Sequence, residues 1–424
     1  MSSRASLWRH PEFARLWSAY TISRLGSQIT LLALPLTAVF VLGAGATETG
    51  LLVAFRMLPS IVPGLFLGVW VDRRRRLPIM VASNIGSALV IGSIPVAAFA
   101  GVLTMPQLYL CGFLAGIFGY ATDLARQAVM PALIGRDELV TANSRMQLSG
   151  AVTQIAGPSL GGVLVQAFTA PVAMAFDAVS FLVSTAILAT IRTRETMHPR
   201  DAGRNVWHDV TEGLRFVRTQ QLLFVSIVAI ALANIEWFIV QALLIVYATD
   251  ELRLSPALLG LAIAAVGPAT LVGAALAGPL TKRIGLGPMM IVALLCEMVS
   301  RLILPFIGGS EVQVAVLLGI TQALVGVTEA LWFVGSRTLQ QAVTPDRLLG
   351  RVGAASFFIQ GGVGPPAALV AGIVGDAIGL RPTLFAAGVI GAIAFAYLVA
   401  SPIRGLRAVP VAAPEADAIP AERV

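Results

Sequence analysis

About a dozen apolar stretches run along this 424-residue chain, and its arginines fall almost entirely in every second gap between them. Hydrophobic residues make up 57% of the sequence and charged residues 12%, against about 25% charged residues in soluble proteins. A water-soluble protein of this length could not cover its surface with so few charges. The pattern therefore predicts an all-α integral membrane protein, because a helix of about 20 apolar residues crosses the hydrocarbon core of a bilayer.

Twelve transmembrane helices are predicted, in two groups of six. The first six spans cover residues 16–42, 49–71, 78–100, 105–126, 145–167 and 171–191. The second six cover residues 221–248, 255–279, 288–308, 311–335, 352–374 and 381–400. Within the polar segment between the groups, an amphipathic helix in the membrane interface would place on one face Trp207, Val210, Leu214 and Val217.

The basic residues predict the orientation, because positive charge is retained on the cytoplasmic side of a membrane. Of 29 Lys and Arg residues, 24 lie in the two tails and in alternate gaps. Arg253 and Arg381 lie in the remaining gaps, and three arginines lie within spans, namely Arg24, Arg56 and Arg301. Both termini are therefore expected in the cytoplasm, with the protein in the inner (plasma) membrane. Because the basic residues are dispersed over many loops, no nucleic-acid partner is expected.

The chain is predicted to have five parts. They are a cytoplasmic amino-terminal segment (1–15), an amino-terminal six-helix bundle (16–191), a cytoplasmic linker (192–220), a carboxyl-terminal six-helix bundle (221–400) and a disordered cytoplasmic tail (401–424).

The two bundles resemble each other at an offset near 210 residues. Three pairs of motifs match in order: Gly68–Arg73 with Gly278–Arg283, Arg126 and Pro131 with Arg337 and Pro345, and Gly157-Pro158 with Gly364-Pro365. Internal repeats of this kind build a central site between two moving halves in many secondary transporters. The alternative is a chance likeness between short loops that contain Gly and Arg.

Several motifs carry a resemblance to a known family. Residues Gly68–Arg76 have a Gly, three further residues, then Asp-Arg and more basic residues. Together with Pro11–Trp17, Asp137–Asn143 and Gly157–Gly162, this loop resembles the major facilitator superfamily. Its Arg-rich form is similar to a branch that holds macrolide-efflux proteins and the enterobactin exporter. The resemblance implies twelve transmembrane helices in two pseudo-symmetric six-helix bundles.

The Arg-rich loop has an expected role as a cytoplasmic gate. Asp72 lies among cations at the end of its span and could pair with Arg126, or with the positive amino end of span 11 near residues 350–353. Asp72, Arg73 and Arg126 would then hold the cytoplasmic side shut. The alternative is a solvated group of charges that only determines the topology.

A run of small residues in span 5 is associated with exporters in the family. It consists of Gly157, Pro158, Gly161 and Gly162. The alternative is close helix packing, since small residues let helix backbones approach each other.

Polar and ionisable residues within spans are functional candidates, because a charge in hydrocarbon is costly. The resemblance implies that spans 1, 4, 7 and 10 line a central cavity. The candidates for that cavity and for coupling are Arg24, Gln28, Glu236, Trp237, Gln241, Glu329 and Trp332. Burial would favour the protonated form of Glu236 and Glu329, so either could exchange a proton and couple transport to a proton gradient. The alternative is a structural role, and span 4 lacks an arginine that many proton-driven members carry.

Other buried polar residues are expected to be structural. Glu297 and Arg301 lie four residues apart in span 9 and are expected to pair with each other. Cys111 and Cys296 both lie within spans, which favours small apolar packing residues over a disulfide or a zinc site.

No nucleotide-binding loop of the form G-x-x-x-x-G-K-[ST] occurs, and no metal-ligand spacing is evident. Together with the family resemblance, this implies a secondary active exporter of amphiphilic small molecules, such as drugs or secondary metabolites, working by alternating access as a proton antiporter. It would be monomeric, without a cofactor or metal, and not an enzyme. Two alternatives stay open: a siderophore or nutrient transporter, including an importer, and a non-transporting membrane receptor or scaffold on the same fold.

Reporter fusions test the predicted topology. Because basic residues mark the cytoplasmic gaps, reporters that are active only in the cytoplasm should be active at both ends of the chain. The same reporter inserted beside Arg253 should be inactive. Activity at only one chain end would contradict an even number of spans.

Overall fold

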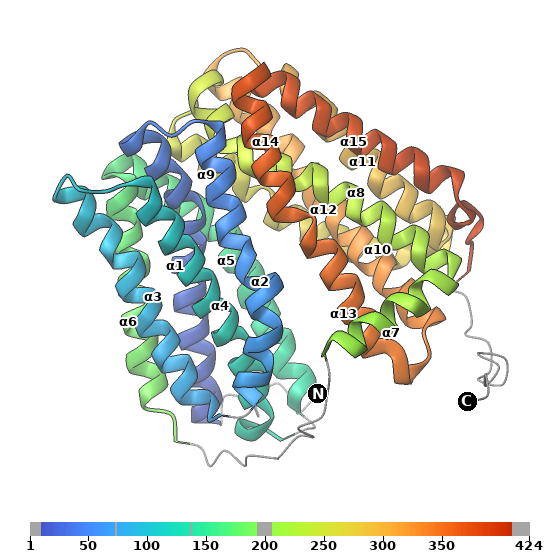
Figure 1. Ribbon diagram of the computed structural model, residues 1–424, viewed down its shortest axis with the longest axis horizontal. Coiled ribbons are helices and arrows are strands. Elements are labelled where there is room, and N and C mark those ends of the chain that lie inside the picture. Colours follow the sequence, from blue (N-terminus) through green and yellow to red (C-terminus); the bar gives the residue numbers. More distant parts are fainter. Residues whose placement is uncertain (1–9, 73, 136–137, 193–205, 409–424) are drawn as a thin grey trace.

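The computed structural model describes residues 10–72, 74–135, 138–192 and 206–408 (Figure 1). These ranges are helical and contain no strand. In this part of the chain, eleven helical segments are long and apolar enough to cross a membrane. Helix α2 (Ala46–Asp72) occupies the place of the predicted second span. The predicted all-α membrane fold with twelve spans is confirmed.

The amino-terminal half forms its six spans from one helix each. They are α1 (Pro11–Leu42), α2 (Ala46–Asp72), α3 (Arg76–Phe99), α4 (Met105–Leu133), α5 (Leu139–Ala167) and α6 (Ala170–Ala189). Helix α1 contacts α5 and α6, and α4 contacts α2 and α3. Several helices are longer than predicted: α1 begins at Pro11 and α4 ends at Leu133. Hydropathy detects only the apolar part of a helix and misses the polar turns at its ends.

The carboxyl-terminal half is less regular. Its elements are α7 (Val206–Thr219), α8 (Gln221–Val246) with η3 (Tyr247–Glu251), α9 (Pro256–Ala264), α10 (Val266–Ile284), α11 (Leu286–Ile303) with η4 (Leu304–Phe306), α12 (Glu311–Val343), α13 (Asp346–Gly362), α14 (Gly364–Ile378), α15 (Leu380–Ala400) and η5 (Pro402–Gly405). Spans 8 and 11 are each divided in two, at Ala265 and at Val363. A proline follows each break, Pro268 and Pro365, and proline cannot donate the backbone hydrogen bond of a continuous helix.

Helix α7 confirms the helix predicted between the two halves. It packs against α13 of the second bundle, where Gly213 lies against the backbone of Arg351. An ion pair between Glu212 and Arg351 (2.5 Å) adds to this contact, and Val217 is buried. The side chains of Trp207 and Val210 are outside the described part of the chain. The helix is therefore fixed to the second bundle by tertiary contacts as well as by its apolar face.

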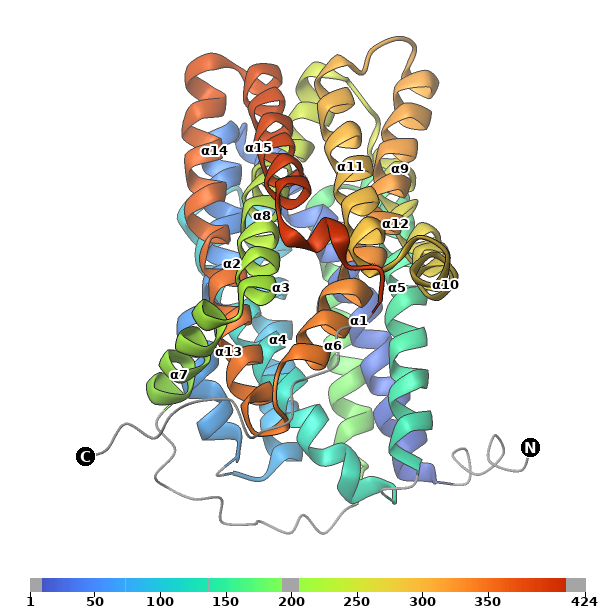
Figure 2. The ribbon, with the colours of Figure 1, turned by 90° about the vertical axis from the view of Figure 1, so that its right-hand side faces the viewer.

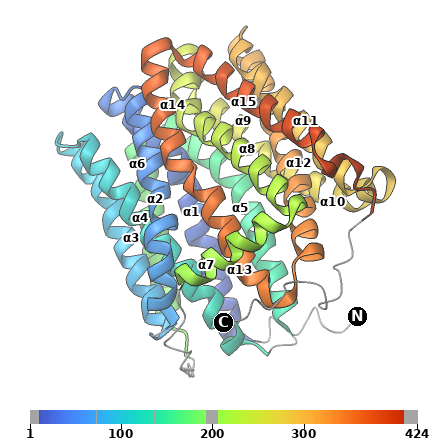
Figure 3. The same ribbon diagram turned by 45° about the vertical axis from the view of Figure 1, so that its right-hand side comes forward.

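The two bundles meet at one side of the molecule and lean apart at the other (Figure 1). Helices α7 and α13 lie toward the side where the bundles lean apart (Figure 2). We call the side where α1 begins and α15 ends the terminal face, and the opposite side, with the loops at residues 43–45, 168–169 and 252–255, the distal face. In the distal half, α14 lies beside α2 and α9 beside α5 (Figure 3).

This distal contact is a close approach of helix backbones at four glycines: Gly50, Gly162, Gly260 and Gly372. A side-chain carbon on Gly50 would lie 2.5 Å from the Ala368 carbonyl oxygen, and one on Gly372 would lie 2.5 Å from the Ala46 carbonyl oxygen. Gly162 and Gly260 approach each other's helices in the same way. Gly50 and Gly260, like Gly162 and Gly372, are 210 residues apart, so the repeat seen in the sequence is also a repeat of tertiary contacts.

Two helix amino termini at the distal face are capped from the opposite bundle. Asp376 of α14 accepts hydrogen bonds from the backbone N–H groups of Ala46 (3.0 Å) and Thr47 (2.9 Å) at the start of α2. Gln166 of α5 accepts one from the N–H of Ala257 (3.1 Å) at the start of α9. Asp376 and Gln166 are again 210 residues apart. Each side chain satisfies N–H groups that have no partner within their own helix.

Enlarging the contacting glycines should open the distal face. In Gly162→Ala or Gly372→Ala the new methyl group would overlap the opposing backbone, and such overpacking costs about 1–3 kcal/mol. A cysteine placed at Val53 in the cavity wall, in a chain lacking Cys111 and Cys296, should then react faster with a membrane-impermeant maleimide added at the distal face.

Gly119→Ala is the matched control, because a side-chain carbon there meets nothing within 4 Å. It should leave the labelling rate unchanged. An equal labelling rate in all three glycine variants would show that the glycines do not keep the distal face closed.

Candidate functional site

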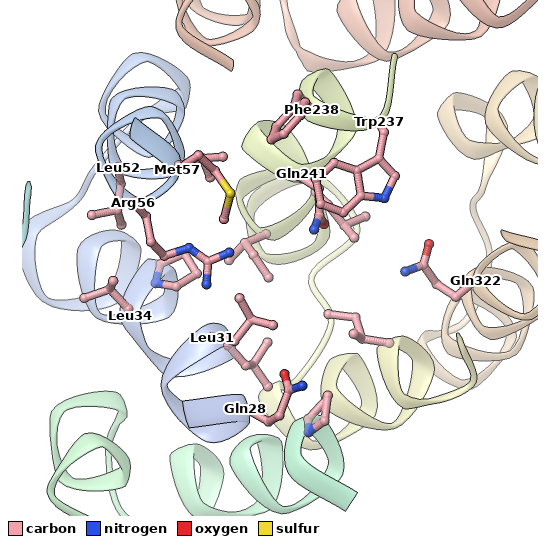
Figure 4. Close-up of a pocket in the computed structure, with 17 residues that line it drawn as sticks. Gln28, Leu31, Leu34, Leu52, Arg56, Met57, Trp237, Phe238, Gln241 and Gln322 are labelled. Atoms are coloured by element: carbon pink, nitrogen blue, oxygen red, sulfur yellow. The ribbon is translucent and has the colours of Figure 1, made fainter. Parts of the chain in front are cut away.

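A cavity of about 110 Å³ lies between the two bundles (Figure 4). Residues of α1, α2, α5, α8, α9 and α12 line it, and most of them are aliphatic. Trp237 and Phe238, whose ring centres are 4.9 Å apart, add aromatic surface. Four polar side chains interrupt this wall: Gln28, Arg56, Gln241 and Gln322. Such a cavity suits an amphiphilic molecule, which needs both apolar surface and a few polar partners.

Three of the seven residues predicted for this site line the cavity, namely Gln28, Trp237 and Gln241. Arg24 lies one helical turn from Gln28 toward the terminal face, and about 20 Å from the start of α1. It is exposed and interacts electrostatically with Arg56 in the cavity wall, so it extends the positive charge from the cavity toward the terminal face. Trp332 is buried in the hydrophobic core of the second bundle and does not line the cavity.

Glu236 points away from the cavity into the second bundle. It is 1% exposed and accepts a hydrogen bond from Nε of Arg301 at 2.9 Å, in a buried ion pair between α8 and α11. Its carboxylate lies against Gly391 of α15, where a larger residue would not fit. Successive helix residues point about 100° apart, so Trp237 faces the cavity when Glu236 faces the bundle interior.

Arg301 lies among three carboxylates, those of Glu236, Glu297 and Glu329. We call these four residues the charge cluster. Glu297 and Arg301 are 7% and 4% exposed, and Arg301 interacts electrostatically with both Glu297 and Glu329. The side chain of Trp237 forms a hydrogen bond with Glu329. Glu329 therefore connects the charge cluster to the cavity wall without lining the cavity itself.

The pairing expected between Glu297 and Arg301 is only part of this arrangement. Both residues lie in α11, but the guanidinium donates its hydrogen bond to Glu236 of α8. The spacing of four residues identified an interaction within the helix. It could not identify the stronger partner, because that partner lies 65 residues earlier in the chain.

Two cavity residues, Arg56 and Gln322, were not among the predicted site residues. Arg56 is one of only three basic residues within the predicted spans, so its depth alone was a usable signal. Gln322 precedes Glu329 by seven residues, which puts both on one side of α12, and this spacing was also a usable signal.

Asp177 joins two helices of the first bundle. It is 1% exposed and accepts hydrogen bonds from the hydroxyls of Thr30 on α1 (2.5 Å) and Ser180 (3.2 Å). Gly26 leaves room for it on α1. These contacts make Asp177 a structural connection between α1 and α6.

The predicted gate at the terminal face is only partly within the described residues. Arg73 is outside them, and so is the side chain of Asp72. Arg126 forms an ion pair with Asp123 at 3.3 Å, and its guanidinium lies 4.6 Å from the ring centre of Tyr20. The gate therefore stays a prediction.

The residues of the span 5 run all lie at helix contacts or at the cavity: Gly157, Pro158, Gly161 and Gly162. Gly157 lies against Gln28 of α1, and Gly161 lies against the backbone of Ile29. Gly162 forms part of the distal contact with α9, and Pro158 lines the cavity. This run thus brings α5 against both α1 and the other bundle.

Metal-binding groups and disulfides do not occur in the part of the chain that the structure describes. No group of three or more His, Cys, Asp or Glu residues there could hold a metal ion. Cys111 and Cys296 are both free thiols.

The sequence matches the model of the family described as Major Facilitator Superfamily over residues 16–365 and 227–420. The chain belongs to the major facilitator superfamily. It is therefore a multi-span membrane transporter of small molecules rather than an enzyme.

Curated relatives agree with the predicted branch of this superfamily. The transporter is 26% identical to the Multidrug efflux pump Tap of Mycolicibacterium fortuitum, over 89% of this chain and 92% of that protein. It is 24% identical to the Enterobactin exporter EntS of Citrobacter koseri, over 81% of this chain and 80% of that protein.

Solved structures share the fold. The nucleoside transporter NupG is similar with a TM-score of 0.75 at 11% identity, covering 92% of this chain and 98% of that one. A bacterial homologue of the iron transporter ferroportin, 20% identical, gives a TM-score of 0.69 in its inward-facing state, covering 93% of this chain and 100% of that one. Its outward-facing structure, 19% identical with 92% and 98% coverage, gives 0.58.

Removing the guanidinium of the charge cluster should destabilise this transporter strongly. Arg301→Met leaves three carboxylates without a counter-charge, and loss of one partner of a buried pair costs about 3–5 kcal/mol. Unfolding of the purified protein in detergent, followed by tryptophan fluorescence, measures the loss. Acidification should restore part of it, because protonation neutralises the unpaired carboxylates.

Arg381→Met is the control, because it breaks an ion pair with Glu251 (2.7 Å) at the exposed distal face. Pairs of that kind contribute about 0–1 kcal/mol. Equal losses in the two variants would contradict the view that Arg301 is a buried counter-charge.

Proposed function

We propose that this transporter is a secondary active exporter of amphiphilic small molecules that works by alternating access. The main support is the position of the cavity. It lies between two bundles whose distal halves are in backbone contact and which lean apart toward the terminal face (Figure 1). A site that reaches one face while the other is sealed is what alternating access requires.

The basic residues support a cytoplasmic terminal face, with both chain ends in the cytoplasm and the protein in the plasma membrane. In that orientation a substrate enters the cavity from the cytoplasm. Release on the other side would require the caps provided by Asp376 and Gln166 to break. The terminal side would then close through its predicted gate of Asp72, Arg73 and Arg126.

Two observations favour export over import. The span 5 run associated with exporters lies at the contact between the bundles, where it can influence which face opens. Two relatives are named a multidrug efflux pump and an enterobactin exporter. A drug, a secondary metabolite or a siderophore therefore fits better than a nutrient taken up by the cell.

The charge cluster is our candidate for coupling to a proton gradient. Its three carboxylates face one guanidinium, so full ionisation would leave an excess of buried negative charge, which is costly. Bound protons would remove this excess. Because Glu329 contacts Trp237 in the cavity wall, a substrate that moves Trp237 would change the surroundings of the cluster. Proton release and substrate binding would thereby be linked.

Efflux from cells or proteoliposomes tests the transport function. A lipophilic dye should leave cells that express the protein, and an uncoupler should abolish this efflux. Accumulation of the dye would instead indicate import. Absence of movement across a panel of dyes, metabolites and siderophores would favour a receptor or scaffold.

Neutral variants of the cluster should separate coupling from transport. Glu236→Gln, Glu297→Gln and Glu329→Gln each fix one site in an uncharged form. We expect loss of uphill efflux driven by a pH gradient, with exchange of labelled for unlabelled substrate retained. Exchange needs alternating access but no net proton movement, so both should be measured in proteoliposomes.

Glu251→Gln at the distal face is the control and should leave both activities unchanged. Uphill efflux that survives in all three cluster variants would exclude these carboxylates as coupling groups. Loss of exchange as well as efflux would indicate a structural role.

A further inference from the structure

We infer that the cavity selects substrates with an anionic group, which Arg56 binds with support from Arg24. The inference rests on the transport function proposed above. It narrows the substrate from amphiphiles in general to acidic amphiphiles, such as molecules with an apolar ring system and a carboxylate.

Arg56 is the one ionisable side chain among the cavity-lining residues. Figure 4 shows its guanidinium extending from α2 into the space bordered by Gln28 and Gln241. No residue in the described part of the chain forms an ion pair or a side-chain hydrogen bond with it. The charged group that interacts with it electrostatically is Arg24, another cation, so no carboxylate in the described residues compensates the charge on this side of the cavity.

The internal repeat shows that helix packing does not require an arginine at this position. The carbonyl oxygen of Arg56 lies against Gly116 of α4. At the equivalent place in the second bundle, 210 residues later, the carbonyl oxygen of Val266 lies against Gly326 of α12. The same backbone contact thus forms with a valine. The charge of Arg56 has no counterpart in the repeat and no role in this contact.

An unpaired guanidinium in an apolar cavity is costly unless water or an anion compensates it. Water can do so while the cavity reaches the terminal face. When that face closes and water is expelled, a bound anion becomes the available compensation. A carboxylate suits this role, because a guanidinium can donate two parallel charge-assisted hydrogen bonds to it. An anionic substrate would therefore stabilise the closed, loaded cavity.

The other polar groups of the cavity complete this picture. The amides of Gln28, Gln241 and Gln322 offer donors and acceptors without charge. Oε1 of Gln322 is buried without a hydrogen-bond partner in the described residues, so a substrate hydroxyl or N–H can donate to it. The carboxylates of the charge cluster do not line the cavity. A cationic compound would thus meet Arg56 in the cavity wall, with Arg24 adding positive charge, and no acid among the lining residues.

Two dyes of similar ring system and opposite charge test the inference. Fluorescein is anionic and rhodamine 123 is cationic at pH 7.4, and fluorescence anisotropy measures their affinity for the purified full-length protein. The wild-type chain should bind fluorescein more tightly than rhodamine 123. Arg56→Gln should weaken fluorescein binding at least about tenfold, the size expected for a lost charged hydrogen bond, and leave rhodamine 123 binding equal or stronger.

Three further variants keep this result interpretable. Arg56→Lys retains the charge and should keep more fluorescein affinity than Arg56→Gln. Arg24→Gln should cause a smaller loss than Arg56→Gln. Arg404→Gln, which removes one exposed positive charge outside the cavity, should change neither affinity. If Arg56→Gln does not yield a folded, monodisperse protein, the comparison of Arg56→Lys and Arg24→Gln with the wild-type chain decides.

An equal ratio of the two affinities in the wild-type chain and in the Arg56 variants would overturn the inference. So would wild-type preference for the cation, or no wild-type binding of fluorescein. Dye efflux measured in parallel separates this from the transport function. Efflux that the uncoupler abolishes but that is equal for both dyes would support the transport function and exclude the anion site. Arg56-dependent binding of fluorescein without efflux would support the anion site and count against the transport function.

Discussion

The close approach of the two bundles at the distal face is the contact on which the rest of the architecture depends. Four glycines allow it, because any side chain there would meet the opposing backbone. The contact seals one end of the cavity and makes the bundles diverge toward the other. It has little directional bonding of its own. Asp376 and Gln166 supply the directional hydrogen bonds, because each caps a helix of the opposite bundle. Water can replace these hydrogen bonds when the contact opens. A seal of this kind is suited to opening and closing.

The two halves share their backbone contacts but differ in charge. In the first bundle, Asp177 on α6 is buried against Gly26 of α1. In the second bundle, α8 corresponds to α1 and α15 corresponds to α6. There the acid is on α8, where Glu236 is buried against Gly391 of α15. Arg56 faces the cavity from the first half, where the second half has Val266. A symmetric framework thus carries arginines near the cavity on one side and a charge cluster behind the cavity wall on the other.

The sequence predicted the features that follow from local composition. Long apolar runs separated by polar gaps predicted the spans, and the matching motifs predicted the repeat. The family resemblance predicted that spans 1 and 7 face the cavity, and Gln28, Trp237 and Gln241 of those spans lie in its wall. Glu236 was assigned to the same cavity on the grounds of depth. Its place in the bundle interior depends on the rotation of α8 about its axis, and packing against α14 and α15, together with the ion pair to Arg301, fixes that rotation.

The sequence by itself determined that this is a membrane protein of twelve spans in two related halves. A bilayer accepts only apolar segments whose backbone hydrogen bonds are satisfied internally, so composition alone restricts the fold. Only the tertiary structure decided which buried charges are paired and which are free. Arg301 meets Glu236, which is distant in the chain, whereas Arg56 meets no carboxylate in the described residues. Whether a buried charge is compensated depends on neighbours brought together by folding, and helices that pack side by side can be far apart in sequence.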